Sequence, residues 1–569
     1  MDFDKQLAGI LCPSFALRTA TDLGVGDTEA VRQMIDWCHR HRFGVLQLLP
    51  INETSDDNSP YNAISSLAIE PNSIAVAPEH LPDLPVKQFK ALATPKLLAE
   101  LRRGPVQYAK VRALKRALLW DAFQVFLAKQ FAKGTVRAEQ FRAFVNRNGG
   151  WVSDYALFRV LMEEHQQSPT WDRWPVEHQD PKRAWAWWLT LPAKRREELT
   201  EKLLFFLYVQ WIAFDQWTAL KAYGTRRNVR LMGDIPFGVS RHSADAWANR
   251  SVFDLEWSGG APPEKTFAVD QFTEKWGQNW GIPLYRWDAL RARNFDWWRT
   301  RVDTIHQVFH LFRIDHVLGM FRIYAFPWRP EENSQYLPLT EAEAAQRSGG
   351  RLPGFRPFAD DTPEHCEQNR QQGEELLAMV LEAAGDTTVV AEDLGVVPHY
   401  VPSSLEKLNV PGFKIPNFLR GHDGWFMDGK AYPRVSLAAL ATHDHPPIAA
   451  TWRELTRKAE AGDPQAQHEL RCWMKYAGLE GVEPPCEFDD RVHEAILRAL
   501  LNSNSWLAVC LITDVFGQEA RFNAPGAVAS SNWTCRLDPT VEGMDQDPVL
   551  RAKTQAFARL VKETNRAAV

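Results

Sequence analysis

Four acidic side chains each stand at the end of a short apolar run, where a carboxylate could do chemistry. The motifs GDIPF, RIDH, AEDL and THDH place Asp234, Asp315, Glu392 and Asp444 there. Taken alone, each acid is more typical of a helix N-cap or a loop ion pair. Four acids after four separate apolar runs favour one shared site, because the carboxyl ends of parallel strands converge on one mouth of a barrel.

Several carboxylates in one site, without a motif for a cofactor, are typical of glycoside chemistry. The sequence contains no HExxH motif, no Gly-rich phosphate loop after the first predicted strand and no GxSxG elbow. In glycoside chemistry one carboxylate acts as the nucleophile and another as the general acid/base. We therefore expect no organic cofactor and no metal ion.

Strand periodicity suggests different roles for two of the acids. Arg313 and Asp315 are two residues apart and point the same way, so the guanidinium should keep Asp315 ionised, as a nucleophile must be. Val390 precedes Glu392 at the equivalent position, and apolar surroundings would hold the proton that a general acid needs. His316 alternates to the opposite face, which predicts a structural role. The alternative is that Arg313 and Asp315 form a structural salt bridge of the barrel.

The elements that must position these residues follow from hydrophobic patterning. Short apolar runs predict buried parallel strands at 43–50, 228–237, 309–316, 388–394, 412–416, 437–444 and 507–515. Helical patterns lie between them at 29–42, 201–222, 296–309, 374–384 and 491–502. Alternating strands and helices predict right-handed βαβ units. The predicted fold class is α/β, a (β/α)8 TIM barrel with large, mostly helical insertions in the βα loops.

Two stretches interrupt this alternation. Residues 82–200 carry amphipathic helical patterns without a strand signal, and residues 326–372 are rich in Pro, Gly and acidic residues. Loops this long are usually functional lids or subdomains. We expect 1–569 to form a single catalytic barrel domain, with a mainly helical insertion subdomain at 82–200 and a smaller insertion or lid at 326–372. Separate domains joined by linkers are the alternative, but no Gly/Ser/Pro linker is present.

The composition argues against several classes of protein. The 569 residues include 66 Lys and Arg against 71 Asp and Glu, and a net charge of −5 does not favour nucleic acid or an anionic membrane. A run of 18 apolar residues and a secretory signal are both absent, and seven scattered cysteines without a CxxC pair indicate a reducing cytoplasm. The 23 Trp suit carbohydrate binding as well as packing.

Longer segments around the acids resemble one known family. FRIDHVLGMFRIYAFP, VVAEDLG, LAALATHDH and MGDIPFGVSRHSADAWANR closely resemble the amylomaltases, the 4-α-glucanotransferases or disproportionating enzymes of glycoside hydrolase family seventy-seven. LQLLPINETSDDNSPYNAISSLAIEP, APPEKTFAVDQFTEKWGQNWGIPLYRWD and NAPGAVASSNWTCRL extend the similarity over roughly residues 10 to 540. Together the segments are highly specific, although each alone is weak.

The resemblance implies catalytic roles for the acids. Asp315 would be the nucleophile, Glu392 the acid/base, and Asp444 would grip the 2- and 3-hydroxyls of the reacting glucose in the transition state. Arg313 would hold the nucleophile, and His443 would hydrogen-bond the same sugar. For His443 the alternative is a hydrogen-bonded core histidine.

The resemblance also implies contacts with substrate. Tyr61 would stack under the sugar in the nucleophile subsite, Asp234 would bind its far hydroxyls, and Gln278 and Trp280 would line the acceptor side. Ordinary packing is the alternative for Tyr61 and Trp280. In relatives an aromatic side chain after APP covers the donor glucan, and here it could be Phe267 or Phe272.

The implied activity is the transfer of α-1,4-glucan segments or glucosyl units between malto-oligosaccharides by a retaining double displacement. The expected partners are maltose, malto-oligosaccharides or soluble α-glucan, with no nucleic acid and no membrane. Two alternatives remain open: an α-amylase-like retaining α-1,4-glucan hydrolase, and a glucan-binding regulatory protein with a dead site. The intact acids argue against the second. The stretch 445–447 (HPP) departs from the family pattern and could alter the loop over the acceptor site.

Overall fold

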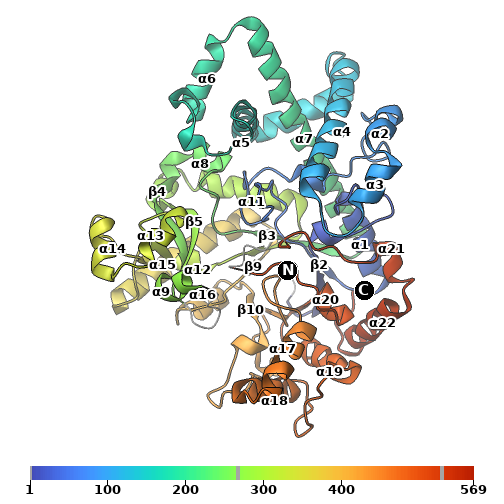
Figure 1. Ribbon diagram of the computed structural model, residues 1–569, viewed down its shortest axis with the longest axis vertical. Helices are drawn as coiled ribbons and strands as arrows, with labels where there is room; N and C mark the ends of the chain where they lie inside the picture. Colours follow the sequence, from blue (N-terminus) through green and yellow to red (C-terminus); the bar gives the residue numbers. More distant parts are fainter. Residues whose placement is uncertain (1–2, 264–269, 526–530, 569) are drawn as a thin grey trace.

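Eight parallel strands close into a barrel at the centre of the molecule (Figure 1). The computed structural model describes residues 3–263, 270–525 and 531–568. Around the barrel the order is β1 (Leu7–Leu11), β12 (Leu507–Leu511), β11 (Ser436–Ala439), β10 (Gly412–Lys414), β9 (Thr388–Ala391), β6 (Leu311–Ile314), β3 (Arg230–Ile235) and β2 (Val45–Gln47). The predicted TIM barrel is confirmed.

The predicted strands correspond to seven of these eight elements. The prediction missed β1, the run LAGIL near the start of the chain, because that run carries no polar residue at its end. All five of its residues are buried and pair in register with Leu507–Leu511 on β12. This pairing, together with that between β1 and β2, closes the barrel.

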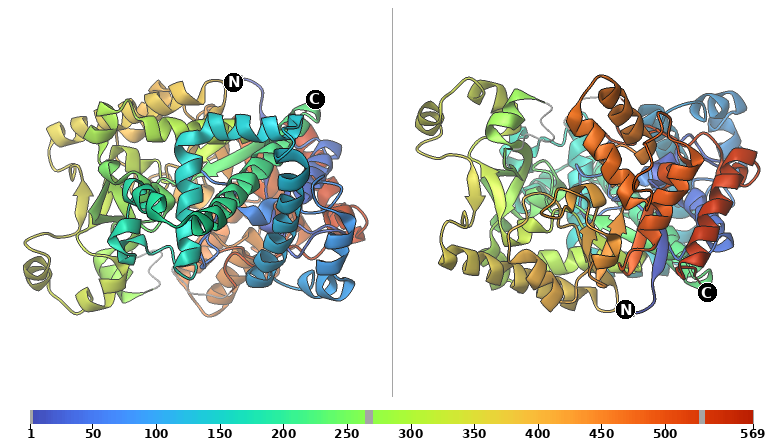
Figure 2. Two further views of the ribbon diagram at one scale, coloured as in Figure 1. Left: turned by 90° about the horizontal axis from the view of Figure 1, so that it is seen from above. Right: turned by 90° about the horizontal axis from the view of Figure 1, so that it is seen from below.

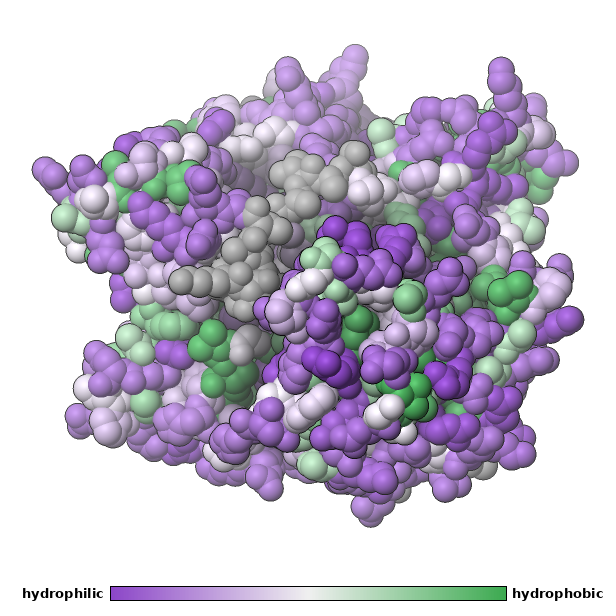
Figure 3. Space-filling view, turned by 60° about the horizontal axis from the view of Figure 1, so that its bottom comes forward, coloured by the Kyte–Doolittle hydropathy of each residue, from purple (hydrophilic) through white to green (hydrophobic). Residues whose placement is uncertain are grey.

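Amphipathic helices cover the outside of the barrel. The first, α1 (Thr28–Arg40), begins where the Asp27 side chain accepts hydrogen bonds from two backbone N–H groups, and it buries Val31, Met34 and Ile35. The later helices follow the same pattern: α11 (Asp296–Val308), α15 (Pro363–Ala384), α19 (Asp490–Leu501) and α22 (Pro548–Glu563). The face of the molecule in Figure 3 is mostly hydrophilic, with hydrophobic side chains in scattered patches.

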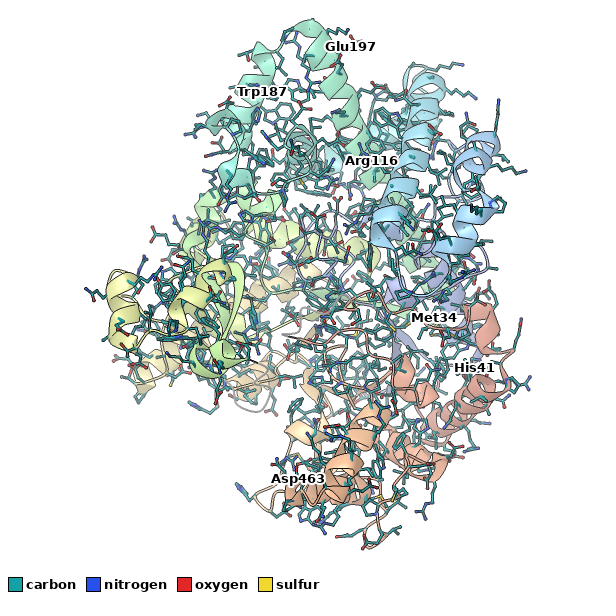
Figure 4. All side chains as sticks on the ribbon, viewed as in Figure 1. Met34, His41, Arg116, Trp187, Glu197 and Asp463 are labelled. Atoms are coloured by element: carbon teal, nitrogen blue, oxygen red, sulfur yellow. The ribbon has the colours of Figure 1, made fainter. Side chains whose placement is uncertain are left out.

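A group of long helices rises from the barrel between β2 and β3. They are α2 (Val86–Leu92), α3 (Pro95–Leu101), α4 (Tyr108–Phe126), α5 (Val136–Glu164), α6 (Pro181–Thr190) and α7 (Ala193–Arg226). They form the upper part of Figure 1 and lie across one end of the molecule when seen from above (Figure 2, left). Trp187 and Glu197 mark their far end in Figure 4.

Among the described helices, α7 is the one with the length and composition of a membrane span. Its most apolar window is 67% buried inside the protein. Phe126 of α4 and Phe141 of α5 pack against Trp211 of α7, with ring centroids 5.5 and 5.7 Å apart. The apolar character of α7 is therefore that of a core helix.

A second sheet lies at one side of the barrel, at the left of Figure 1. Its antiparallel order is β5 (Gln278–Tyr285), β4 (Phe253–Ala261), β7 (Ile323–Phe326) and β8 (Gly354–Arg356). Together with α9 (Gln271–Trp276) and α13 (Asn333–Tyr336), it surrounds a separate small core that includes Phe272, Trp276, Phe326 and Trp328. The region expected as a long excursion, 326–372, thus contributes one strand, β8, and part of this small core, which its Pro- and Gly-rich sequence concealed.

Helix α12 (Leu318–Phe321), directly after the RIDH motif, packs against α15, which leads into β9. Gly373 allows this close approach, because a Cβ there would lie 2.0 Å from a ring carbon of Phe321. The contact joins the two strands that carry Asp315 and Glu392.

Gly373→Ala should lower the melting temperature, because the added methyl overpacks this contact and destabilises the protein by about 1–3 kcal/mol. Gly150→Ala in α5 is the matched control, since no atom lies within 4 Å of its Cβ position, and it should stabilise by about 1 kcal/mol. Thermal melting at one scan rate compares them. Equal melting temperatures would contradict the packing described here.

Candidate active site

The Arg313 guanidinium lies at the centre of a buried charge cluster. Its Nε donates to Asp234 Oδ1 at 2.9 Å, and its Nη2 lies 2.9 Å from Asp234 Oδ2 and 2.6 Å from Asp315 Oδ1. The side chains of Arg313 and Asp234 are 3% and 0% exposed. Asp234 on β3 stands opposite Arg313 on β6 in the strand register, so the pairing of these strands builds the ion pair.

Asp315 and Glu392 follow neighbouring strands of the barrel. Arg313 pairs with Val390 and Ile314 with Ala391, which places the next residues, Asp315 and Glu392, side by side. Glu392 Oε2 accepts a hydrogen bond of 2.7 Å from the backbone N–H of His316. The site therefore holds the nucleophile and acid candidates on adjacent strands.

The pKa of Glu392 supports its expected protonation. Burial raises the pKa of Glu392 to about 7, although Arg313 and the N–H of His316 both act to lower it. A carboxyl group with this pKa retains a proton close to neutral pH. Burial thus raises the pKa as the sequence analysis expects, although charged groups and two backbone N–H groups, rather than apolar side chains alone, face this carboxyl.

Burial and the neighbouring arginine have opposite effects on the pKa of the Asp315 carboxyl group. Burial raises the pKa of Asp315 above its usual range, Arg313 acts to lower it, and Asp234 and Glu392 act to raise it. The predicted ion pair is present, but it is not the largest influence on the carboxyl group, because the sequence does not reveal the burial. Asp315 and Glu392 titrate together, and the contact with Arg313 favours leaving the negative charge on Asp315.

Asp444 lies in the turn after β11, two strands from β9 in the barrel order. Asn523 Nδ2 donates to its Oδ1 at 2.6 Å, and His443 Nε2 lies 3.3 Å from its Oδ2. Burial acts to raise the pKa of Asp444, but His443 and the Asn523 hydrogen bond hold it below its usual range. A third carboxylate in this mouth thus remains ionised.

Tyr61 connects the Arg313–Asp234 ion pair with His443, which lies beside Asp444. Its hydroxyl donates to Asp234 Oδ2 at 2.7 Å and accepts from Arg313 Nη2 at 3.1 Å. Its ring stacks on His443 with centroids 5.0 Å apart and planes 9° apart. Tyr61 therefore reaches the charge cluster and also fixes the histidine beside Asp444.

Gln278 and Trp280 reach the site from β5 of the second sheet. Trp280 is 40% exposed, and its Nε1 donates to Gln278 Oε1 at 3.1 Å. The Trp280 ring meets the His316 ring edge-on at 4.9 Å. Direct contacts thus connect six predicted site residues, which are Arg313, Asp234, Asp315, Tyr61, His443 and Asp444. Glu392 follows the neighbouring strand, and Gln278 and Trp280 lie at the rim.

The strand alternation expected for His316 does not occur, and its structural role stays a prediction. Strand β6 ends at Ile314, and His316 adopts a φ of +47°, so strand alternation does not extend to it. Its ring faces Trp280, and its N–H binds Glu392. A positive φ at a non-glycine residue is not readable from an apolar pattern.

Sequence reasoning also gave no role to Asn523 and Arg521. Asn523 belongs to the NAPG segment that carries part of the family resemblance, and Arg521 donates to the backbone carbonyl of Asp444. Both residues are distant from Asp444 in the chain, so only the fold reveals the contact. The NAPG segment, which carries part of the family resemblance, was the sequence signal that could have indicated a role for Asn523.

The two aromatic candidates for covering a donor have different outcomes. Phe272 is 9% exposed and stacks on Phe326 in the small core, so it does not cover the barrel mouth. Phe267 lies outside the described residues.

The HPP stretch directly follows Asp444. His445 Nδ1 lies 2.8 Å from Thr442 Oγ1, and Pro447 occupies the N-cap position of α17 (Ile448–Glu460). The departure from the family pattern forms a tight turn after Asp444.

Comparisons with known proteins show which family the chain resembles. The family model of the 4-alpha-glucanotransferases of glycoside hydrolase family 77 matches residues 12–541. The 4-alpha-glucanotransferase of Thermus thermophilus is 31% identical over 535 residues, covering 90% of this chain and 91% of that protein. The 4-alpha-glucanotransferase of Chlamydia caviae is 30% identical over 550 residues, covering 94% and 91%.

Solved amylomaltases share the fold. The Streptococcus agalactiae enzyme, in complex with acarbose, aligns with a TM-score of 0.75 at 22% identity and covers 99% of this chain and 100% of that chain. The Corynebacterium glutamicum enzyme aligns with a TM-score of 0.76 at 21% identity, covering 98% and 75%.

Arg313→Met should destabilise the protein by about 3–5 kcal/mol, because it leaves Asp234 buried without its cation. Arg457→Met is the control, since Arg457 pairs with Glu454 on the surface with 67% of its side chain exposed, and it should leave the melting temperature unchanged. Thermal melting measures both. A stable Arg313→Met protein would show that the cluster does not depend on this guanidinium.

Proposed function

The chain belongs to the 4-alpha-glucanotransferases of glycoside hydrolase family 77, and we propose that Asp315, Glu392 and Asp444 carry out its reaction. The enzyme transfers α-1,4-glucan segments between malto-oligosaccharides by a retaining double displacement. The observation that carries the assignment is the placement of Asp315, paired with Arg313, beside Glu392 on the adjacent strand.

In the first step, Asp315 attacks the anomeric carbon of the donor, and Glu392 protonates the departing glycosidic oxygen. A glycosyl ester forms on Asp315, and the leaving sugar takes the proton. Neighbouring strands in a sheet lie about 4.8 Å apart, which suits the ~5–5.5 Å separation of carboxyl groups in retaining enzymes. Arg313 holds the attacking oxygen in place at 2.6 Å.

In the second step, Glu392 removes a proton from the 4-hydroxyl of the acceptor, which displaces Asp315 from the sugar. Two inversions restore the α configuration. Gln278 and Trp280 stand at the rim, next to His316 and Glu392, and would orient the acceptor. Excluding water from this position favours transfer over hydrolysis.

The remaining groups bind the reacting glucose or position the side chains that bind it. Asp444, kept ionised by His443 and Asn523, accepts hydrogen bonds from the 2- and 3-hydroxyls and would bind most tightly in the transition state. The Asp234 side chain is fully buried and bonded to Arg313 and Tyr61, so it positions these two side chains and does not reach the far hydroxyls that the family resemblance assigns to it. Tyr61 supports the ring, and its own position is fixed by His443.

We propose maltose, malto-oligosaccharides or soluble α-glucan as substrates, and neither nucleic acid nor a membrane as partner. The acarbose complex of the S. agalactiae amylomaltase supports this substrate class. A single catalytic barrel domain spans 1–569, with the helical insertion at 82–200 and a smaller insertion at 326–372. The seven cysteines are all unpaired, which supports the cytoplasm as the compartment.

Incubation with maltotriose tests the activity. A transferase forms glucose together with products longer than maltotriose. Glucose and maltose alone would identify the hydrolase instead, and an unchanged substrate would identify a binding protein. Chromatography of the product ladder distinguishes these outcomes.

Asp315→Asn should reduce transfer on the order of 10⁴-fold or more, because the amide fills the same volume but cannot form the glycosyl ester. Asp288→Asn is the control, since the Asp288 side chain is fully exposed on α10 (Trp287–Ala292). Initial rates with maltotriose and the melting temperature should be measured together. A folded Asp315→Asn protein that keeps a tenth of the activity would place the nucleophile elsewhere.

The pH profile should reflect Glu392. With its pKa raised to about 7, the acid loses its proton as the pH rises through that value, so kcat/KM for maltotriose should fall above about pH 7. An α-glucosyl fluoride donor needs little protonation of its leaving group, and its profile should be flatter. Identical basic limbs for the two donors would argue against Glu392 as the acid.

A further inference from the structure

A second cavity of about 370 Å³ lies against the antiparallel sheet, and none of the residues of the Arg313 cluster lines it. Its volume is within the range of small-ligand sites in proteins. The residues that define it are Arg241, Glu256, Trp257, Trp328, Arg329 and Arg351.

An irregularity of β4 builds this cavity. Between the pairs Asp254–Leu284 and Gly259–Ile282, β4 advances five residues while β5 advances two. The additional residues bulge out of the ladder, and 255–258 form one wall. On the other side β7 ends at Phe326, and the following Pro327 and Trp328 form the opposite wall. Bulges of this kind are frequent beside functional sites.

The cavity wall carries three arginines and two glutamates, and a third carboxylate, Asp172, lies behind it. Arg351 lies 3.1 Å from Glu256, and Arg329 lies 3.5 Å from Asp172 behind the wall. Arg241 Nε is buried, has no hydrogen-bond partner among the described residues, and lies 4.0 Å from Asp172 Oδ2. The three guanidiniums are thus balanced by Glu256, Asp172 and the further lining carboxylate, Glu332.

This balance favours a neutral ligand rich in hydroxyl groups. Guanidiniums donate to hydroxyl oxygens, and carboxylates accept from hydroxyl hydrogens, so a sugar satisfies both. An inorganic anion would meet repulsion from the carboxylates, and an apolar ligand would desolvate charged groups without replacing their contacts.

The aromatic walls are rigid. The Arg356 guanidinium lies 4.3 Å from the Trp257 ring centroid, and Trp328 stacks on Tyr336 at 3.8 Å with planes 6° apart. Fixed indoles lose little entropy when a ligand binds. They give the cavity apolar surface for the carbon face of a sugar.

The cavity shares β5 with the rim of the active site. Ser258 Oγ donates to Asn279 Oδ1 at 2.5 Å, and Asn279 Nδ2 donates to the Trp328 carbonyl at 3.2 Å. Asn279 stands between Gln278 and Trp280, so one strand supports the cavity wall and the acceptor side.

We propose that this cavity is a second carbohydrate-binding site, which holds a short segment of an α-glucan chain that is not the reacting segment. The identity of the sugar rests on the proposed function. A long glucan would be retained by the cavity as well as by the barrel mouth, whereas maltotriose needs only the mouth.

Native electrophoresis in gels with and without glycogen tests this site in the full-length protein. Trp257→Ala and Arg329→Gln are each combined with Asp315→Asn, so that glycogen is not altered during the run. Trp185→Ala on α6 is the matched control. Loss of an anchoring contact should raise the apparent Kd for glycogen about tenfold in the two cavity variants. The control should match the parent protein.

The same substitutions in the active protein should change kcat/KM for maltotriose less than about twofold. Unchanged glycogen retention in both folded cavity variants would overturn the proposal, as would an equal loss on maltotriose. Calorimetric binding of inorganic phosphate that Arg329→Gln abolishes would instead identify an anion site. Glycogen retention that depends on Trp257, in a protein without transfer activity, would refute the proposed function but not this site.

Discussion

The buried ion pair between Arg313 and Asp234 is the constraint on which the rest of the site depends. One guanidinium contacts two carboxylates and the Tyr61 hydroxyl at almost complete burial. A charge removed from water to this degree is tolerated only with its partners in place. The pair joins β3 and β6 in register. Asp315 is therefore placed correctly only when these two strands pair correctly.

Around this pair, three carboxylates have different surroundings, and burial raises the pKa of Asp315 and of Glu392 but not that of Asp444. Asp315 contacts a cation, Glu392 is buried with a pKa raised to about 7, and Asp444 is held ionised by His443 and Asn523. Different environments separate the pKa values of chemically similar groups, which supports the proposed division between nucleophile and acid. The second sheet then adds Gln278 and Trp280 at the rim of the site, and the β4 bulge adds a cavity beside this sheet.

The sequence predicted the repeating strands of the barrel and the acidic residues that follow them. Buried parallel strands are apolar on both faces, so their runs revealed seven of eight strands and the acids at their ends. It could not reveal contacts made by chain folding over long separations, such as Asn523 with Asp444, or the backbone reversal at His316. The small core around Phe272 was hidden because β4 and β5 contain Gly and Pro and carry few consecutive apolar residues.

Trapping the covalent intermediate tests the central claim most directly. Glu392→Gln should still accept a glucosyl unit from α-glucosyl fluoride, whose departure needs little acid, but should transfer it onward slowly. Peptide mass spectrometry of the quenched protein should then find one glucosyl unit on the peptide that contains Asp315. A glucosyl unit on Asp234 or Asp444, or fluoride release with an inverted product and no labelled peptide, would contradict the account.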